Sequence, residues 1–192
     1  MGKIKNLGIL GPAGSGKGIA ADYISRKYHY KLINLGNIVR ALARKEKIKP
    51  TRANLEKLQL KYSKIYGKDF VIGRALEKAK KINKPVILDG IRKPVQARLA
   101  KQKLKAKLIL VNADPRLRFE RMKKRRRTGF ARNLKEFLEQ EKKEERFFNL
   151  KKTFSMVDYK ADNSNGMRFL FKQIDEIMKK IKKNEKQKKK DS

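Results

Sequence analysis

The stretch that decides the fold reads Gly11-Pro12-Ala13-Gly14-Ser15-Gly16-Lys17-Gly18. It follows an apolar run ending in Ile9-Leu10 and opens onto a segment with helical periodicity. A strand, a glycine-rich loop and a helix start form the context in which backbone N–H groups cradle a phosphate. The helix N-terminus adds partial positive charge, and Lys17 supplies a mobile cation for the outer phosphates. We therefore expect this loop, with Ile19 directly after it, to bind the phosphates of ATP.

The composition limits the class of protein. At 192 residues the chain is expected to form one domain over residues 1–183. It has no cysteine, which excludes disulfides, thiolate metal sites and a thiol nucleophile. The start of the chain shows no signal peptide, and no apolar run is long enough to cross a membrane. These observations predict a cytoplasmic protein with no membrane partner.

The net charge of +35, from 54 basic and 19 acidic residues, is far more than ATP binding requires. It has two readings: lysine filling solvated faces, or a polyanionic partner such as RNA, DNA or the ribosome. Residues 184–192 carry lysine without an apolar face, and we expect them to form a disordered basic tail.

Short apolar runs alternate with longer amphipathic segments, which is typical of an α/β fold with a parallel sheet. The expected strands are 4–10, 31–34, 86–89, 107–111 and a weaker 157–160. The expected helices are 17–28, 36–45, 52–65, 70–82, 95–104, 115–126, 134–149 and 167–183. The very polar segment 125–152 is expected to leave the sheet as a mobile helical lid. The fold class predicted is a three-layer αβα sandwich of the P-loop type, with five parallel strands.

Polar side chains follow these strands at the edge where ligands bind in such sheets. Asp89 ends an apolar strand and is positioned to hold Mg²⁺, directly or through water. Arg92 lies just beyond it, and Arg40 follows the second strand; both offer planar forks for a second phosphate. The alternative for each is ordinary: a turn aspartate and solvated arginines.

Further along the chain, Arg118, Arg121 and Arg125 recur at helical spacing. In phosphoryl transfer the protein mainly positions groups and neutralises charge, so arginines around the transferred group are expected. Arg121 and Arg125 are the stronger candidates, and the alternative is a solvated basic helix. The turn around Asn163 is either an ordinary helix cap or a contact to the nucleotide base.

With these residues in view, the chain resembles the nucleoside monophosphate kinase group, adenylate kinase in particular. The resemblance rests on the glycine-rich loop, on Asn34-Leu35-Gly36-Asn37-Ile38-Val39-Arg40 and on Asp89-Gly90-Ile91-Arg92. The last third, with Asp158-Tyr159-Lys160-Ala161-Asp162-Asn163-Ser164, is more similar to dephospho-CoA kinase. The similarity covers about residues 4–181. The chain departs from adenylate kinase at Ile19, where that family has threonine, and it lacks a β-type or zinc-binding lid.

The resemblance implies roles for these residues. Helices within 36–82 would bind the acceptor, with Gly36, Arg40 and Arg92 near its phosphate and Gln96 reading its base. Asp89 would lie by Mg²⁺, and Arg121 and Arg125 would begin the lid. The expected function is ATP-dependent phosphoryl transfer to a small phosphorylated acceptor, first a nucleoside or deoxynucleoside monophosphate. Two alternatives stay open: dephospho-CoA kinase, with Asp89 as general base, and a nucleotide-binding RNA- or ribosome-associated protein.

Overall fold

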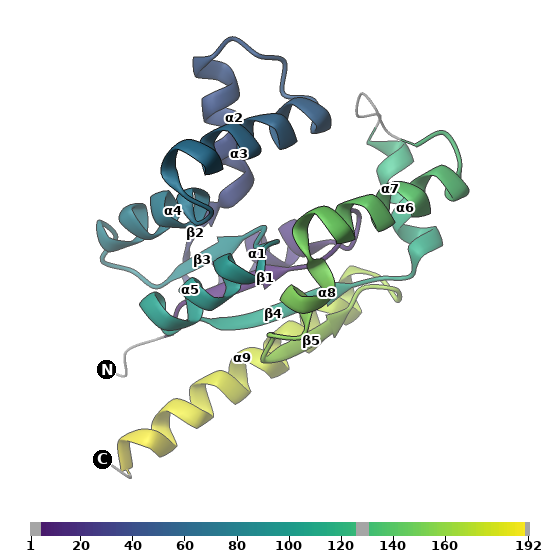
Figure 1. The fold of residues 1–192 in the computed structure, drawn as a ribbon. Helices are drawn as coiled ribbons and strands as arrows, with labels where there is room; N and C mark the ends of the chain where they lie inside the picture. The colour runs from purple at the N-terminus through teal and green to yellow at the C-terminus, as the bar shows by residue number, and fades with distance from the viewer. Residues whose placement is uncertain (1–4, 126–130, 191–192) are drawn as a thin grey trace.

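A computed structural model of the chain describes residues 5–125 and 131–190. The strands are β1 (Leu7–Leu10), β2 (Lys31–Asn34), β3 (Val86–Asp89), β4 (Lys107–Asn112) and β5 (Tyr159–Asp162). The helices are α1 (Lys17–Tyr28), α2 (Leu35–Lys45), α3 (Arg52–Tyr66), α4 (Phe70–Lys80), α5 (Pro94–Leu104), α6 (Pro115–Lys124), α7 (Leu134–Phe148), α8 (Leu150–Phe154) and α9 (Met167–Lys190). Figure 1 shows the sheet in the middle of the molecule, with helices on both faces.

The five strands form one parallel sheet in the order β2-β3-β1-β4-β5. This confirms the predicted fold class. The order reverses beside β1, so the strand that leads into the glycine-rich loop is central. Ligands in such sheets bind beyond the carboxyl ends of the strands at this reversal.

Alternate residues of each buried strand enter two separate cores, as the two-residue period of a strand requires. Leu88 and Leu108 pack with α2, α4 and α5 on one face. Ile87 and Ile109 pack with α1 and α9 on the other. Asp175 on α9 accepts hydrogen bonds from two α1 tyrosine hydroxyls and so fixes the two helices of that face together.

Several element boundaries differ from the sequence expectations. Asn149 takes left-handed backbone angles, with φ of 54°, and this divides the predicted helix 134–149 from a short α8. The fifth strand lies two residues later than expected, at Tyr159–Asp162. The expected strand at 4–10 begins in the structure at Leu7, and its first residue, Ile4, lies outside the described residues. Arg126, the expected end of the sixth helix, also lies outside them.

The C-terminal segment differs most from its prediction. Helix α9 continues to Lys190, so residues 184–190 are helical where we expected a disordered tail. Lysine, glutamate and glutamine are good helix formers, and no glycine or proline interrupts the segment. Figure 1 shows the end of α9 extending past the sheet. Residues 191–192 lie outside the described part. Within that part, every helix is too short or too polar to cross a membrane.

Candidate functional site

The loop between β1 and α1 has the geometry of an anion cradle. Gly14 and Gly16 both have positive φ, 77° and 91°, which side-chain-bearing residues rarely adopt. A Cβ on Gly14 would lie 2.6 Å from the Arg118 carbonyl oxygen, and one on Gly16 would overlap the Asn163 amide. Gly16 caps α1 without a side-chain hydrogen bond, so the first N–H groups of the helix keep their capacity for an anion.

Lys17 lies at the start of α1 and donates a 3.1 Å hydrogen bond to the Pro12 carbonyl. Burial, and to a lesser degree the nearby Arg92 guanidinium, lowers the pKa of Lys17 from 10.5 to about 8. The carboxylates of Asp89 and Glu144 act in the opposite direction. Lys17 is therefore held among charged groups from three other elements, and an added anion would favour its charged form.

Asp89 ends β3 and is 5 % exposed. Its Oδ2 accepts a 2.5 Å hydrogen bond from the Asn34 amide, at the end of the neighbouring strand β2. Its Oδ1 is buried and has no hydrogen-bond partner. A buried carboxylate oxygen without a partner is costly, so this atom suits a water or a cation that arrives with a ligand.

The buried Oδ1 of Asp89 also bears on whether the site fits Mg²⁺. Among the described residues no cluster of three or more histidine, cysteine, aspartate or glutamate side chains could enclose a metal. A single buried carboxylate fits an ion that keeps most of its waters and is held mainly by nucleotide phosphates. The residues present therefore fit the predicted role of Asp89, direct or through water.

The predicted acceptor residues lie at the same edge of the sheet. Arg40 donates to the Asn37 and Asn34 side-chain oxygens at 3.1 and 3.5 Å, and its guanidinium lies close over Gly36. Arg92 pairs with Glu144 on α7 and packs over the Phe148 ring at 5.2 Å.

Gln96 is buried, and its Oε1 accepts from the Arg92 and Lys93 backbone amides at 2.8 and 3.1 Å. Its oxygen is thus used to cap α5, although the residue also lines the cavity that Asp89 and Arg92 line. The expected reading of an acceptor base by Gln96 stays a prediction.

One cavity of about 810 Å³ joins these groups. Its lining includes Asp89, Arg92 and five loop residues: Ala13, Gly14, Gly16, Lys17 and Gly18. On the opposite side it is lined by residues of α2, α3 and α7. The donor loop and the predicted acceptor residues therefore open into a single space, large enough for two small ligands.

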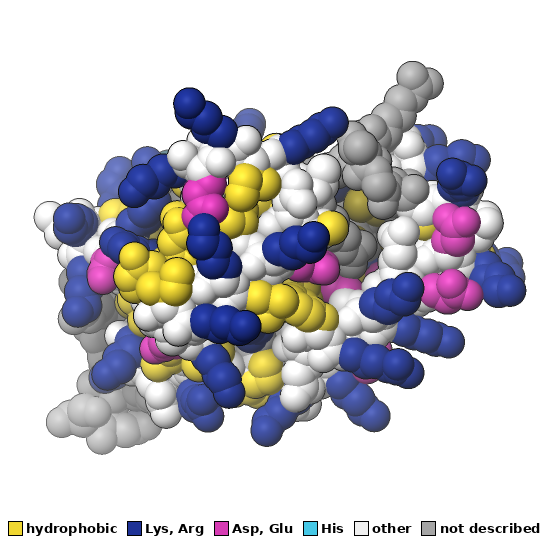
Figure 2. Space-filling model, turned by 45° about the horizontal axis from the view of Figure 1, so that its top comes forward, with side chains coloured by type: hydrophobic (Ala, Val, Ile, Leu, Met, Phe, Trp, Pro, Cys, Tyr) yellow, Lys and Arg dark blue, Asp and Glu magenta, His cyan; other side chains and the backbone are white. Residues whose placement is uncertain are grey.

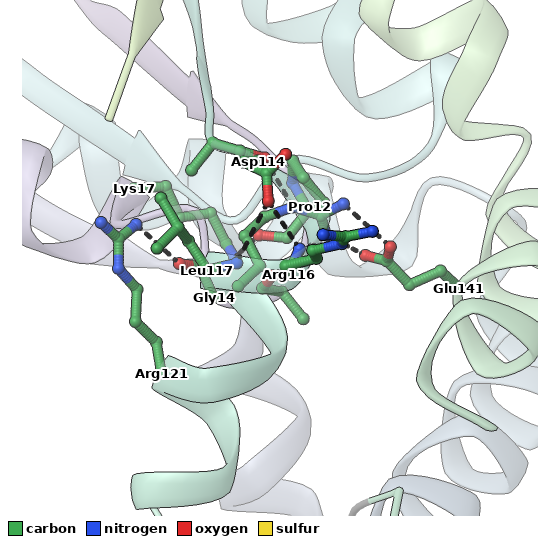
Figure 3. Close-up of polar contacts among 11 residues, drawn as sticks. Pro12, Gly14, Lys17, Asp114, Arg116, Leu117, Arg121 and Glu141 are labelled. Atoms are coloured by element: carbon green, nitrogen blue, oxygen red, sulfur yellow. Dashed lines mark hydrogen bonds and ion pairs between the residues drawn. The ribbon is translucent and has the colours of Figure 1, made fainter. Parts of the chain in front are cut away.

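Arg118 and Arg121 of α6 and Arg125, which follows it, lie in three different environments. Arg125, the cap residue after α6, lines the cavity. Arg121 instead donates to the Gly14 and Asn163 carbonyls at 3.5 and 2.8 Å, and Figure 3 shows it beside the loop. Arg118, the weakest of the three in sequence, is 6 % exposed and pairs through two nitrogens with Glu141 on α7. It also donates to the Ala13 carbonyl at 3.4 Å.

Five of the predicted nucleotide contacts are not part of the cavity lining: Gly11, Pro12, Ser15, Ile19 and Asn163. Asn163 donates a 2.9 Å hydrogen bond to the Ser15 carbonyl and so supports the loop from behind. Ile19 faces a separate groove beside Tyr23 and Phe171. Their expected contacts to ATP stay predictions.

Sequence reasoning missed the acidic residues of α7. Glu141 and Glu144 lie three residues apart, so they share a face of the helix, and both pair with arginines at the site. A signal was present, because these two glutamates recur at helical spacing in the segment expected to form a lid. In the structure α7, which lies within that segment, contacts α6 and pairs with Arg92.

Comparison with known proteins agrees with this geometry. A family model described as "AAA domain" matches residues 10–139. A UPF0200 protein from Staphylothermus marinus is 25 % identical over 173 residues, covering 90 % of each chain. A UPF0200 protein from Pyrococcus horikoshii is 28 % identical over 179 residues, covering 90 % of this chain and 95 % of its own.

Solved structures share the fold. Shikimate kinase from Acinetobacter baumannii superimposes with a TM-score of 0.63 at 14 % identity, covering 95 % of both chains. A protein called TT1252 from Thermus thermophilus gives a TM-score of 0.61 at 20 % identity, covering 93 % of this chain and 98 % of its own. These likenesses show an α/β fold of the P-loop kinase type.

Proposed function

The chain belongs to the AAA domain family, and from this premise we propose that it is an ATP-dependent kinase for a small phosphorylated acceptor. Nucleoside and deoxynucleoside monophosphates are the first candidates. The observation that carries the proposal is the shared cavity, which is lined by the glycine-rich loop and by Arg40, Asp89 and Arg92. A hydrolase needs only the glycine-rich loop that binds the nucleotide, whereas a transferase also needs residues that bind the acceptor.

In this mechanism the loop N–H groups hold the ATP phosphates, and Lys17 neutralises the outer ones. Arg40 and Arg92 hold the acceptor phosphate in line with the γ-phosphorus, and Arg125 neutralises charge on the transferred group. An acceptor phosphate oxygen forms a bond to the γ-phosphorus while the bond to the β-γ bridging oxygen breaks, and ADP leaves. The acceptor is already an anion, so no protein base is needed. Mg²⁺, when bound, would supply further charge neutralisation, and Asp89 is the residue to hold it.

Lys17 is the sharpest single test of the proposal. A screen with radiolabelled ATP should show transfer to at least one nucleoside monophosphate, and Lys17→Met should abolish it. The matched control is Lys103→Met, an exposed lysine on α5, which removes the same charge away from the cavity. Full transfer by Lys17→Met would refute the assignment.

Dephospho-CoA kinase is the second candidate, because the buried Oδ1 of Asp89 has no hydrogen-bond partner. A hydroxyl acceptor requires a general base within reach, and an unpartnered carboxylate oxygen is suited to that role. Dephospho-CoA in the same screen separates the two candidates: labelled product from it, with none from monophosphates, favours the second.

A further inference from the structure

Glu144 is a buried carboxylate inside the cavity. It is 7 % exposed, lies on α7 and pairs with the Arg92 guanidinium. It also acts electrostatically on Lys17, which places its charge near the donor loop. Ions this buried are costly unless they are paired, so the position of Glu144 depends on its partner.

Arg92 is the residue to which the proposed function gives the acceptor phosphate. A carboxylate and a phosphate bind a guanidinium in the same way, through oxygens on its N–H groups. Glu144 therefore occupies a position that an acceptor anion needs. The second pair, between Glu141 and the buried Arg118, fixes α7 one turn away and keeps Glu144 in place.

We propose that Glu144 is an internal ligand of Arg92 and that it decides which acceptors enter: a dianionic phosphate displaces it, whereas a monoanionic carboxylate does not. This inference rests on the proposed function and names its acceptor class more narrowly. Glu144 is the specificity-determining residue because an entering anion must replace the carboxylate already bound to Arg92. The net binding free energy of the anion is therefore the difference between its interaction with Arg92 and that of Glu144.

Charge makes the difference between the two acceptor types. A tethered group acts at an effective concentration in the millimolar range or above, so a free carboxylate of equal charge competes poorly. A dianion carries twice the charge into a site that also holds Lys17 and Arg125. The displaced Glu144 carboxylate then turns to its other contacts or to water, because a buried carboxylate is unfavourable without a partner.

Anion titration tests the proposal. Inorganic phosphate and acetate are titrated at pH 8 into the full chain by calorimetry, first with the loop saturated by a non-hydrolysable ATP analogue and Mg²⁺. Wild type should bind phosphate and not acetate. Glu144→Gln should bind phosphate about tenfold more tightly, a change of ~1.4 kcal/mol, and should now bind acetate. The matched control is Glu145→Gln, which removes the same charge from an exposed neighbour on α7 and should match wild type.

Two further variants keep the result interpretable. The gain should vanish when Glu144→Gln is combined with Arg92→Met, because the competition occurs at Arg92. Glu144→Asp, with a shorter carboxylate, should shift phosphate affinity in the same direction by less, and serves if the amide variant folds poorly.

Unchanged or weaker phosphate binding in Glu144→Gln, or acetate binding by wild type, would overturn the proposal. In the first case Glu144 would position Arg92 and not compete for it. If the ATP analogue does not bind, the proposed kinase function fails. The titrations without it still test Glu144 through their dependence on Arg92.

Discussion

At the scale of single residues, Lys17 links the site to pH. Its pKa of about 8 in the folded protein lies below the usual 10.5 of the unfolded chain. Between these values the unfolded state holds one more proton, so stability rises with pH through that window. At neutral pH the perturbation costs roughly 3 kcal/mol at most. We therefore expect Lys17→Met to unfold at higher denaturant concentration than wild type at pH 7, although it is inactive.

The lowered pKa of Lys17 also predicts that the protein takes up a proton when a nucleotide binds. Phosphate charge beside Lys17 restores its ordinary pKa, so binding at pH 9 should take up as much as one proton. Calorimetry in two buffers of different ionisation enthalpy measures this number. Lys17→Arg, which stays charged, should show no uptake. Equal uptake by wild type and Lys17→Arg would exclude Lys17 as its source.

The glycines of the loop are not equivalent, and a matched pair of alanine variants shows it. Gly14→Ala should cost about 2 kcal/mol or more, because it strains a residue at φ of 77° and its Cβ meets the Arg118 carbonyl. Gly18→Ala should be neutral or stabilising by up to ~1 kcal/mol, since Gly18 is helical and a Cβ there meets no atom within 4 Å. Urea unfolding measures both, and equal losses would contradict the loop geometry described.

The sequence could predict that Asp89, Arg40 and Arg92 converge, because carboxyl ends of parallel strands meet at one edge of the sheet. The spacing of Glu141 and Glu144 was visible in the sequence, but the pairing of Glu144 with Arg92 was not predictable, because it depends on how α7 docks onto a residue 52 positions earlier in the chain. Nor could the sequence predict that Arg118 is buried while Arg125 lines the cavity. The two residues lie seven positions apart, at helical spacing, yet Arg118 pairs with Glu141 on α7 and donates to the Ala113 and Ala13 carbonyls.

At the scale of elements, α7 is held to the core by two ion pairs. The Arg118–Glu141 pair is partly buried and also joins the loop, through the Ala13 carbonyl. Glu141→Gln should therefore cost about 2–4 kcal/mol, because it leaves the Arg118 charge buried without its partner. The control is Glu139→Gln, an exposed position on α7, which should stay within ~0.5 kcal/mol of wild type.

A wider effect follows for the same variant. If Arg118 positions the loop, Glu141→Gln should also raise the KM for ATP while Glu139→Gln leaves it unchanged. A loss of stability with an unchanged KM would make the pair structural only.

Element types were predictable because hydrophobic period and glycine or proline boundaries fixed them, as at β3 and α5. The residues at which the elements begin and end were less predictable. The break at Asn149 needs a left-handed backbone that asparagine tolerates but does not require. The helical end of α9 follows from the helix propensity of its lysine, glutamate and glutamine residues. The disordered tail was predicted from the absence of an apolar face alone, without regard to that propensity.

At the scale of the whole molecule, the excess of positive charge is not concentrated in the C-terminal segment. Residues 184–192 contain four lysines and two carboxylates, a small part of the net +35. Figure 2 shows lysine and arginine side chains spread over the face that it presents, with few acidic ones between them. A polyanion would therefore meet the body of the protein more than its end.

This distribution improves the test of nucleic-acid binding. Truncation must follow Lys183, because Ile181 is 3 % exposed and belongs to the core between α1 and α9. If RNA is a partner, the 1–183 chain should bind single-stranded RNA with a log affinity that falls linearly with log salt. Each phosphate contact contributes about 0.7 to the slope, so removal of the four lysines of residues 184–192 should lower the slope by no more than about 3. Binding lost on truncation would assign it to the tail alone, whereas no binding by the full chain at ~50 mM salt would mean that the lysines only solvate the surface. Tight binding together with inactivity toward every small acceptor would instead favour an RNA- or ribosome-associated role over the kinase proposed above.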